Sequence, residues 1–330
     1  MTEENLPYAA LFICVLVFCL ILEKIWIPLL KKCSAAQPIL EIGPSWHAVK
    51  AGTPTMGGVA FIAAGILGLG TVYWLFGARL LSQESRLTGA VVIYAVLCGG
   101  VGFLDDFCKL RNKRNQGLTS AQKYFLLLVA SGIFLVVLRG LCGVSTRIYV
   151  PFLAIEADPG AFYYPLALVY LTGVVNALNL TDGLDGLLAS TAAVAGAFFV
   201  WYGIRTARGV LTAVGVLMLA SALGFLPFNA HPAKVFMGDT GSLFFGALMA
   251  GGGLAAAVPA TTLLAGGVYV AEALSVILQV FYFKLTHGKR LFKMAPIHHH
   301  FEKCGWSERK IVGLFCVVAL IFALIAYRGG

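Results

Sequence analysis

Ten apolar segments, each long enough to cross a lipid bilayer, follow one another along this chain of 330 residues. A membrane-spanning helix needs about 20 apolar residues, so ten helices would use about 200 and leave about 130 for loops and ends. That remainder is too small for a sizeable soluble domain, and we expect one transmembrane domain over residues 1–330. The expected spans are 8–30, 56–77, 88–106, 123–139, 162–178, 186–204, 210–227, 240–258, 261–284 and 309–327.

The composition agrees with this pattern. Only 12% of the residues are charged and 59% are hydrophobic, whereas soluble proteins carry about 25% charged residues. These values exclude an ordinary soluble enzyme, a disordered chain and a collagen-like repeat. The sequence therefore predicts an all-α polytopic integral membrane protein of about ten helices, with its chemistry in loops and at helix ends.

The cysteines and the first residues further limit the kind of membrane protein that the sequence can encode. None of the eight cysteines forms a CxxC or other paired spacing, which argues against a disulfide framework or a cysteine zinc site. Glu3 and Glu4 stand where a signal peptide would carry Lys or Arg. We therefore expect the first apolar segment to be retained as a span.

The distribution of Lys and Arg predicts the orientation in the membrane. With the N-terminus outside, 16 of these side chains fall in inner loops and 7 on the outer side, which favours both termini outside. The net charge of +9 is then explained by cytosolic loops and needs no nucleic-acid partner. The longest outer loop, 140–161, holds a short alternating run and a Pro-Gly turn, which is consistent with a small β-hairpin.

Carboxylates gather on the same inner side, although the orientation was assigned from Lys and Arg alone. One of the six aspartates, Asp158, lies outside. The other five lie at cytosolic ends of spans, which points to a single site: Asp105, Asp106, Asp182, Asp185 and Asp239.

Adjacent carboxylates end the third span at Asp105 and Asp106, with Lys109 on the same helix face. Paired acids at a membrane boundary are costly without a cation or water, and they commonly hold Mg²⁺. The alternative is a solvated helix end whose acids pair with Lys109.

Two glycine-rich motifs carry the other inner aspartates. NALNLTDGLDGL, residues 176–187, offers amides and carboxylates for sugar hydroxyls, a base edge or a metal. FMGDTGSL, residues 236–243, places Asp239 at the start of a span, where a turn and helix N-terminus favour phosphate or metal, and Phe236 could stack on a planar base. In the alternative interpretation the aspartates are helix N-caps and Phe236 is an interfacial anchor.

The remaining polar features are weaker signals. PIHHHFEK, residues 296–303, suits hydrogen bonds to phosphate or carboxylate oxygens better than one zinc ion, unless it is only a solvated loop. Lys50 and the Gly/Pro-rich turn after it could contact phosphate, although the segment by itself is better explained as a plain turn in an inner loop. Glu272 lies in mid-span with Gln279 on the same helix face, and it is either functional or paired inside the bundle.

These segments, together with AGTPTMGG at 51–58 and DDFCK at 105–109, resemble the signature segments of the phospho-N-acetylmuramoyl-pentapeptide transferases, in the order of that family. The resemblance covers about residues 45–312. It implies transfer of phospho-MurNAc-pentapeptide from UDP-MurNAc-pentapeptide to undecaprenyl phosphate, with lipid I and UMP as products and Mg²⁺ as cofactor. It further implies a bacterial cytoplasmic membrane location, an active site facing the cytosol, and a homodimer.

The resemblance also implies residue roles. Asp105, Asp106 and Asp239 would be catalytic, with Asp239 as the Mg²⁺ ligand. Substrate contacts are implied, in the phosphate, nucleotide-sugar and pocket-lining regions, for Lys50, Thr55, Lys109, Lys123, Asn179, Asp182, Asp185, Asn229, Phe236, Gln279, His298, His299 and His300.

Two mechanisms and two other functions stay open at this point. The lipid phosphate could attack the nucleotide sugar directly, which we favour, or an aspartate could attack first and form a covalent intermediate. The nearest rival function is a sister enzyme that uses UDP-GlcNAc. A secondary transporter with Glu272 as coupling residue is remote, because transporters place polar sites near the midplane and contain inverted repeats.

Overall fold

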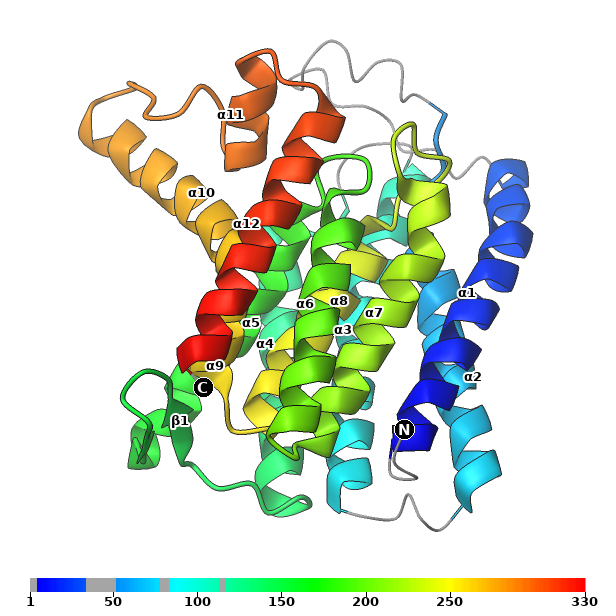
Figure 1. The fold of residues 1–330 in the computed structure, drawn as a ribbon. Helices are drawn as coiled ribbons and strands as arrows, with labels where there is room; N and C mark the ends of the chain where they lie inside the picture. The colour runs from blue at the N-terminus through cyan, green and yellow to red at the C-terminus, as the bar shows by residue number, and fades with distance from the viewer. Residues whose placement is uncertain (1–4, 34–51, 78–82, 113–116, 330) are drawn as a thin grey trace.

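The computed structural model describes residues 5–33, 52–77, 83–112 and 117–329, which form a helical bundle with one small β-hairpin (Figure 1). The elements are α1 (Leu6–Lys32), α2 (Gly58–Phe76), α3 (Gln83–Asn112), α4 (Ser120–Gly140), β1 (Ile148–Val150), β2 (Ile155–Ala157), the 3-10 turn η4 (Gly160–Phe162), α5 (Tyr163–Thr181), α6 (Leu187–Arg205), α7 (Gly209–Asn229), α8 (Gly238–Ala255), α9 (Pro259–Ala265), α10 (Gly267–Leu285), α11 (Ile297–Lys303) and α12 (Glu308–Gly329).

Helix α8 forms the centre of the bundle. Every residue from 240 to 255 is buried, and the helix packs against α2, α3, α5 and α7. Its glycines and alanines leave little side chain between the backbones, which lets the neighbouring helices approach closely. The first turn of α8 carries Asp239, so this packing fixes one of the predicted site residues at a helix end.

The predicted spans correspond to the helices with two differences. Among the described residues, nine helices are long and apolar enough to cross a membrane: α1 to α7, α10 and α12. Helix α8 is below this level of hydropathy because its first turn is polar and it is rich in glycine, and its neighbours bury it in place of lipid. The predicted span 261–284 is divided at Gly266 into α9 and α10.

The predicted hairpin is confirmed. Strands β1 and β2 pair antiparallel, with Tyr149 opposite Glu156. The hairpin lies at the same end of the bundle as both chain termini (Figure 1). Its first strand is joined to the bundle by a hydrogen bond from the N–H of Tyr149 to the carbonyl of Ala257.

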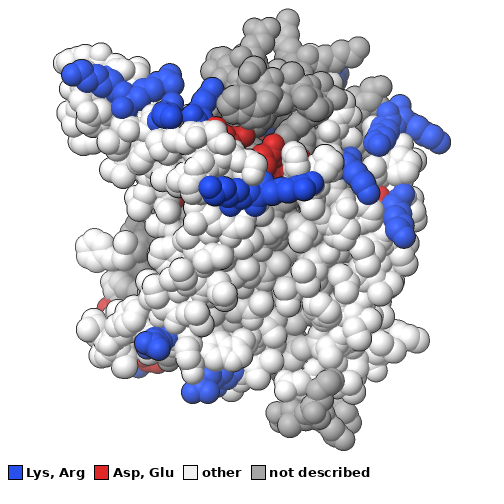
Figure 2. All heavy atoms as spheres, turned by 45° about the horizontal axis from the view of Figure 1, so that its top comes forward, with Lys and Arg blue, Asp and Glu red and all other residues white. Residues whose placement is uncertain are grey.

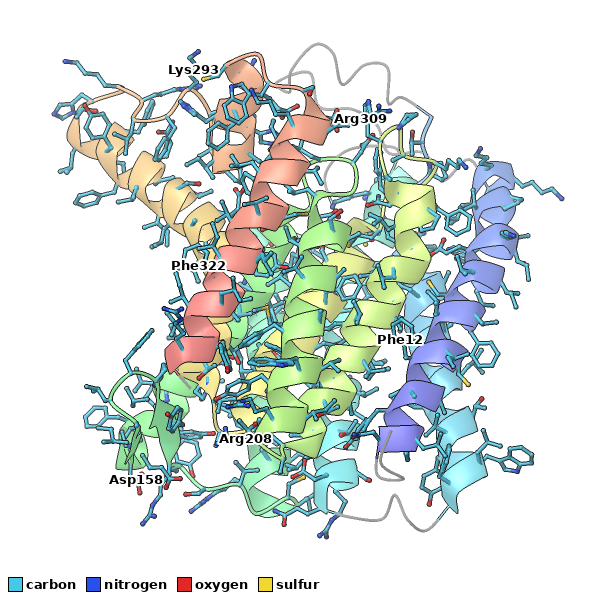
Figure 3. The ribbon with its side chains drawn as sticks, viewed as in Figure 1. Phe12, Asp158, Arg208, Lys293, Arg309 and Phe322 are labelled. Atoms are coloured by element: carbon cyan, nitrogen blue, oxygen red, sulfur yellow. The ribbon has the colours of Figure 1, made fainter. Side chains whose placement is uncertain are left out.

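Charged and apolar side chains are separated along the bundle. In Figure 3, Lys293 and Arg309 lie at one end, Asp158 and Arg208 lie at the other, and Phe12 and Phe322 lie between them. Large apolar side chains are exposed along this middle zone, for example Val136 at 72% and Val169 at 68%. Exposure of this kind is expected where lipid, and not water, surrounds the protein. We call the end with Lys293 and Arg309 the site end.

Candidate functional site

Three aspartates from two helices meet at the site end, and we call them the acidic cluster. Asp105 and Asp106 come from the last turns of α3, and Asp239 comes from the first turn of α8. One carboxylate oxygen from each lies within 4.8 Å of the other two. Asp105 and Asp106 are almost fully buried, with 3% and 2% exposure. Three of the five aspartates that the sequence predicts at one site therefore converge in the structure.

Asp106 holds the start of α8 in place. Its two carboxylate oxygens accept hydrogen bonds from the N–H of Asp239 at 3.2 Å, the N–H of Thr240 at 3.0 Å and the hydroxyl of Thr240 at 2.7 Å. The preceding residue, Gly238, has φ +70°, and a Cβ there would collide with the Asp106 carboxylate. Glycine is thus required for both the backbone conformation and the space. Asp106 acts as a capping group for α8 from another helix.

Two lysines share the Asp239 carboxylate. Lys109 Nζ lies 2.9 Å from Asp239 Oδ2 and 2.6 Å from Asp105 Oδ2. Lys123, from the first turn of α4, also lies 2.9 Å from Asp239 Oδ2. Helix α4 begins with a capping box between Thr119 and Gln122, which fixes the start of the helix just before Lys123. Both ammonium groups therefore lie at the acidic cluster.

Asn179 closes the polar network from the side of α5. Its Nδ2 donates to Asp239 Oδ1 at 2.8 Å and to Ser242 Oγ at 2.8 Å. Its Oδ1 accepts from Lys123 Nζ at 3.0 Å. Side chains from α3, α4, α5 and α8 therefore converge on Asp239, which explains why residues distant in sequence make one site.

The charges of this network leave room for a cation. Two ammonium groups face the three carboxylates of the acidic cluster, which leaves one net negative charge when all three carboxylates are ionised. Asp182 ends α5 nearby. Desolvation raises the pKa of Asp182 well above its ordinary value, and the negative charges of Asp239, Asp106 and Asp185 raise it further. An added divalent ion would counter the repulsion among these negative charges. The donor set, all carboxylate oxygen, is the one that Mg²⁺ and Ca²⁺ prefer.

The segment around Thr55 lies against the acidic cluster. The N–H of Phe236 donates to the carbonyl of Pro54, and the N–H of Gly57 donates to the carbonyl of Phe236. Thr55 is 3% exposed, and its hydroxyl has no hydrogen-bond partner among the described residues. An unsatisfied buried hydroxyl is costly, so Thr55 is a candidate ligand group. Phe236 is partly exposed, as a stacking side chain would need to be.

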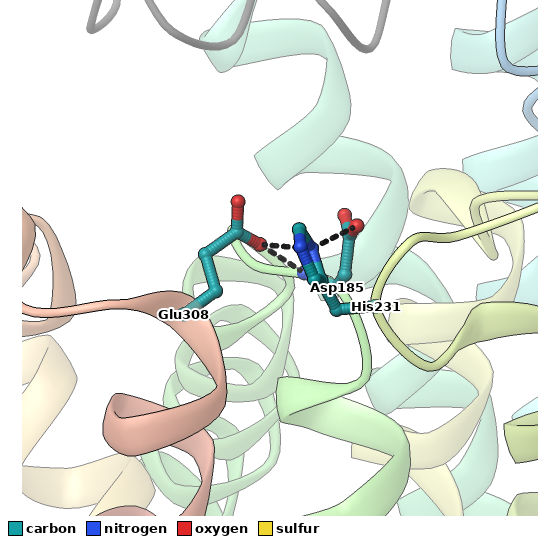
Figure 4. Close-up of side chains that lie close together, drawn as sticks. All are labelled: Asp185, His231 and Glu308. Atoms are coloured by element: carbon teal, nitrogen blue, oxygen red, sulfur yellow. Dashed lines mark hydrogen bonds and ion pairs between the residues drawn. The ribbon is translucent and has the colours of Figure 1, made fainter.

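A second polar group lies beside the first at Asp185, His231 and Glu308 (Figure 4). His231 Nδ1 lies 3.0 Å from Asp185 Oδ2 and 3.7 Å from Glu308 Oε2. Asp185 Oδ2 also accepts the N–H of Ala233, and Glu308 Oε2 accepts the N–H of Asp185. The group joins the turn 182–186 to the α7–α8 loop and to the start of α12. The sequence did not predict site roles for His231 and Glu308, because neither repeats a spacing typical of a site.

Two predicted substrate residues bind the protein's own backbone. Asn229 Oδ1 accepts the N–H of Gly186, and its Nδ2 donates to the carbonyl of Val235. Gln279 Oε1 accepts the N–H groups of Leu291 and Phe292, and its Nε2 donates to the carbonyl of Phe292. Both residues therefore hold loops of the site, and their substrate contacts stay a prediction. Lys50 lies outside the described residues.

The three histidines point to different partners. His298 is fully buried, with Nδ1 3.1 Å from Glu272 Oε1. His299 Nδ1 lies 2.6 Å from Glu302 Oε2. His300 Nδ1 accepts the N–H of Lys293 at 3.1 Å. Consecutive residues on a helix diverge by about 100°, so they do not present one surface together.

Positive charge surrounds the site end. Figure 2 shows acidic atoms set among uncharged ones at that end, with Lys and Arg side chains on either side of them. A buried negative centre within a basic rim suits a substrate that carries phosphate groups and arrives with a metal ion. The chemistry that this arrangement supports best is phosphoryl transfer by positioning and charge neutralisation.

Two family models match the sequence. The glycosyl transferase family 4 model matches residues 88–257, which include the acidic cluster and the turn 182–186. The phospho-N-acetylmuramoyl-pentapeptide-transferase signature 1 matches residues 50–62, the segment around Thr55.

Curated bacterial relatives are similar over most of the chain. The phospho-N-acetylmuramoyl-pentapeptide-transferase of Clostridium botulinum strain Alaska E43 is 42% identical over 311 residues, which cover 94% of this chain and 92% of the relative. The proteins of the same name from Oceanobacillus iheyensis and Clostridium perfringens strain SM101 are 45% and 46% identical. Each match covers 308 residues and 92% of the relative, with 92% and 93% of this chain.

Proposed function

Because the chain belongs to the phospho-N-acetylmuramoyl-pentapeptide transferase family, we propose that it transfers phospho-MurNAc-pentapeptide to undecaprenyl phosphate. The donor is UDP-MurNAc-pentapeptide, and the products are lipid I, a precursor of peptidoglycan, and UMP. The observation that carries this proposal is the acidic cluster with its two lysines at the end of a membrane bundle. A water-soluble nucleotide sugar can meet a lipid phosphate only where the aqueous phase touches the bilayer.

Mg²⁺ is the proposed cofactor, and the residues present fit it. Three carboxylates offer hard oxygen ligands within 4.8 Å of one another, and the buried Thr55 hydroxyl lacks a partner. Asp239 is the proposed ligand, with Asp105 and Asp106 beside it. When bound, Mg²⁺ would neutralise negative charge on the diphosphate oxygens. Lys109 Nζ and Lys123 Nζ now share Asp239 Oδ2, so they are placed to release that oxygen and bind phosphate.

Direct attack by the lipid phosphate is the favoured mechanism. A phosphate monoester has a second pKa of about 6, so most of it is already dianionic at neutral pH and needs no strong base. Asp105 would orient the attacking oxygen or take its residual proton. Lys109 and Lys123 would hold the transferred and leaving phosphates in line. Trapping a phosphorylated aspartate after incubation with the nucleotide sugar alone would contradict this mechanism.

The nucleotide sugar is proposed to bind between the turn 182–186 and the α7–α8 loop. Phe236 would stack on the uracil ring, since aromatic side chains bind bases through their faces. Asn179 and Asp182 would contact the ribose or the phosphates. The other contacts implied by the family resemblance are Lys50, Thr55, Asp185, Asn229, Gln279, His298, His299 and His300.

The surroundings of the enzyme follow from the same proposal. The chain is a multi-pass bacterial membrane protein; we place it in the cytoplasmic membrane with the site end facing the cytosol, as the Lys and Arg bias supports. Residues 1–330 would form one transmembrane domain. The homodimer stays a prediction of the resemblance, and the mass of the protein in micelles, corrected for detergent, would test it.

The test of function is UMP release by the purified full chain in detergent micelles. Undecaprenyl phosphate and Mg²⁺ are supplied with either UDP-MurNAc-pentapeptide or UDP-GlcNAc. We expect UMP only with the muramoyl substrate. Release with UDP-GlcNAc alone would reassign the chain to the sister activity, and release with neither would end the proposal.

A further inference from the structure

Glu272 and His298 form a fully buried pair, and the proposed mechanism gives no role to Glu272. Glu272 lies in the second turn of α10, His298 lies on α11, and both side chains have 0% exposure. His298 Nδ1 lies 3.1 Å from Glu272 Oε1. Their four polar atoms have no aligned hydrogen bond among the described residues. A buried carboxylate is retained at such cost mainly where its charge has a task.

The free edge of the His298 ring faces the site. A Cβ built on Gly183 would collide with His298 Nε2, so the imidazole lies directly on the backbone of that glycine. Gly183 has no positive φ, so it is the imidazole that requires glycine at this position. Gly183 follows Asp182 within the turn 182–186, and Asp182 in turn lies beside the acidic cluster.

Helix α10 carries this contact on a narrow inner face. Val268 and Tyr269 are buried in the first turn, and Glu272 and Ser275 continue the same buried face. Most of the helix leans away from the bundle (Figure 1). Gln279, two turns after Glu272, holds the loop before α11 through three hydrogen bonds. Helix α10 thus contacts the loop before α11 through Gln279 and the His298 ring through Glu272.

We propose that Glu272 is a positioning residue whose carboxylate holds the His298 ring, with Nδ1 protonated, against Gly183 and so fixes the turn 182–186 for transfer. A carboxylate beside one ring nitrogen sets both the tautomer and the orientation of an imidazole. The neutral amide of glutamine would keep the shape of the side chain and lose the charge. This inference depends on the proposed function.

The first test compares two buried glutamates. Glu272→Gln is expected to lower kcat for lipid I formation about 10- to 100-fold, as loss of an orienting partner does, with the KM for undecaprenyl phosphate unchanged. The matched control is Glu23→Gln in α1, where Glu23 is also 0% exposed and has no hydrogen bond or ion pair to the site in the described structure. Its kcat should equal that of the wild type. Equal kcat values in all three proteins would overturn the inference, whereas a wild type without activity would instead refute the proposed function.

A double-mutant cycle separates positioning from general support of the fold. If Glu272 acts through the ring, Glu272→Gln adds no further loss of kcat to His298→Ala. Independent, multiplicative losses would contradict the proposal. Conversely, Gly183→Ala should lower kcat in the wild-type background. In the His298→Ala background the same substitution should lower kcat much less, because removal of the ring makes room for the new methyl group.

If Glu272→Gln cannot be purified in folded form, ¹⁵N NMR of the histidine-labelled wild type tests the proposal through the protonation of His298 Nδ1. The ring signal that disappears in His298→Ala is assigned to His298. A protonated Nδ1 at neutral pH supports the proposal, and an unprotonated Nδ1 overturns it.

Discussion

Asp106 and Asp105 are adjacent in sequence, yet they bind different parts of the molecule. Asp106 accepts three hydrogen bonds from the first turn of α8, whereas Asp105 contacts Lys109 and accepts the N–H of Leu118 at 2.8 Å. The first carboxylate therefore stabilises the fold around Asp239. The second is held between the lysine and the chain that leads into α4, where it is placed for chemistry.

This difference predicts distinct effects of the two matched amide substitutions. Asp106→Asn puts an NH₂ group among donors from Asp239 and Thr240, and we expect it to destabilise the protein by about 1–3 kcal/mol. Asp105→Asn should lower activity and leave the apparent Tm in micelles nearly unchanged. Thermal unfolding of both variants measures this, and equal Tm values would contradict the assignment of Asp106 as a cap.

Sequence patterns predicted the acidic cluster because carboxylates in turns between apolar spans are uncommon without a function. They could not predict which histidine faces the site, since the HHH run gives no information on the side chain that lies against Gly183. The contacts among Asp185, His231 and Glu308 could not be predicted from the sequence either. It depends on how three loops meet, and not on spacing within any one of them.

At the scale of elements, α10 and the loop after it behave as a unit joined through Gln279. Each of its three hydrogen bonds is to the backbone of Leu291 or Phe292. We predict that Gln279→Ala speeds amide hydrogen exchange in residues 286–296 and leaves exchange in α10 unchanged. Faster exchange throughout α10, or no change in the loop, would show that Gln279 does not anchor it.

The helices themselves were largely predictable, because lipid requires long apolar segments. Two details were not. The break at Gly266 separates α10 from the short α9, which packs against α12, and a continuous apolar sequence does not reveal it. Helix α11 is too short and too polar for the periodicity to indicate, and it is ordered by its contacts with α10 and α12.

At the scale of the whole molecule, the two ends of the bundle are expected to face different compartments. Cys304 is exposed beside the histidine run, and Ser145 is exposed near the hairpin, in the loop that is predicted to lie outside. A membrane-impermeant maleimide offered to intact cells with a permeable outer envelope should label Ser145→Cys and not Cys304, each as the single cysteine of the chain. Labelling must reverse in inverted vesicles, and the opposite pattern would refute the predicted orientation.

The central claim is that aspartates from separate helices act with a divalent ion at one membrane face to transfer a phospho-sugar. Its most direct test is formation of radiolabelled lipid I by the wild type and by Asp239→Asn, with Mg²⁺, with a chelator, and after Mg²⁺ is restored. We predict that product forms only with Mg²⁺, returns when the ion is restored, and falls at least about 100-fold in the folded variant. Lipid I made at the wild-type rate by Asp239→Asn, or by the wild type in chelator, would contradict the account.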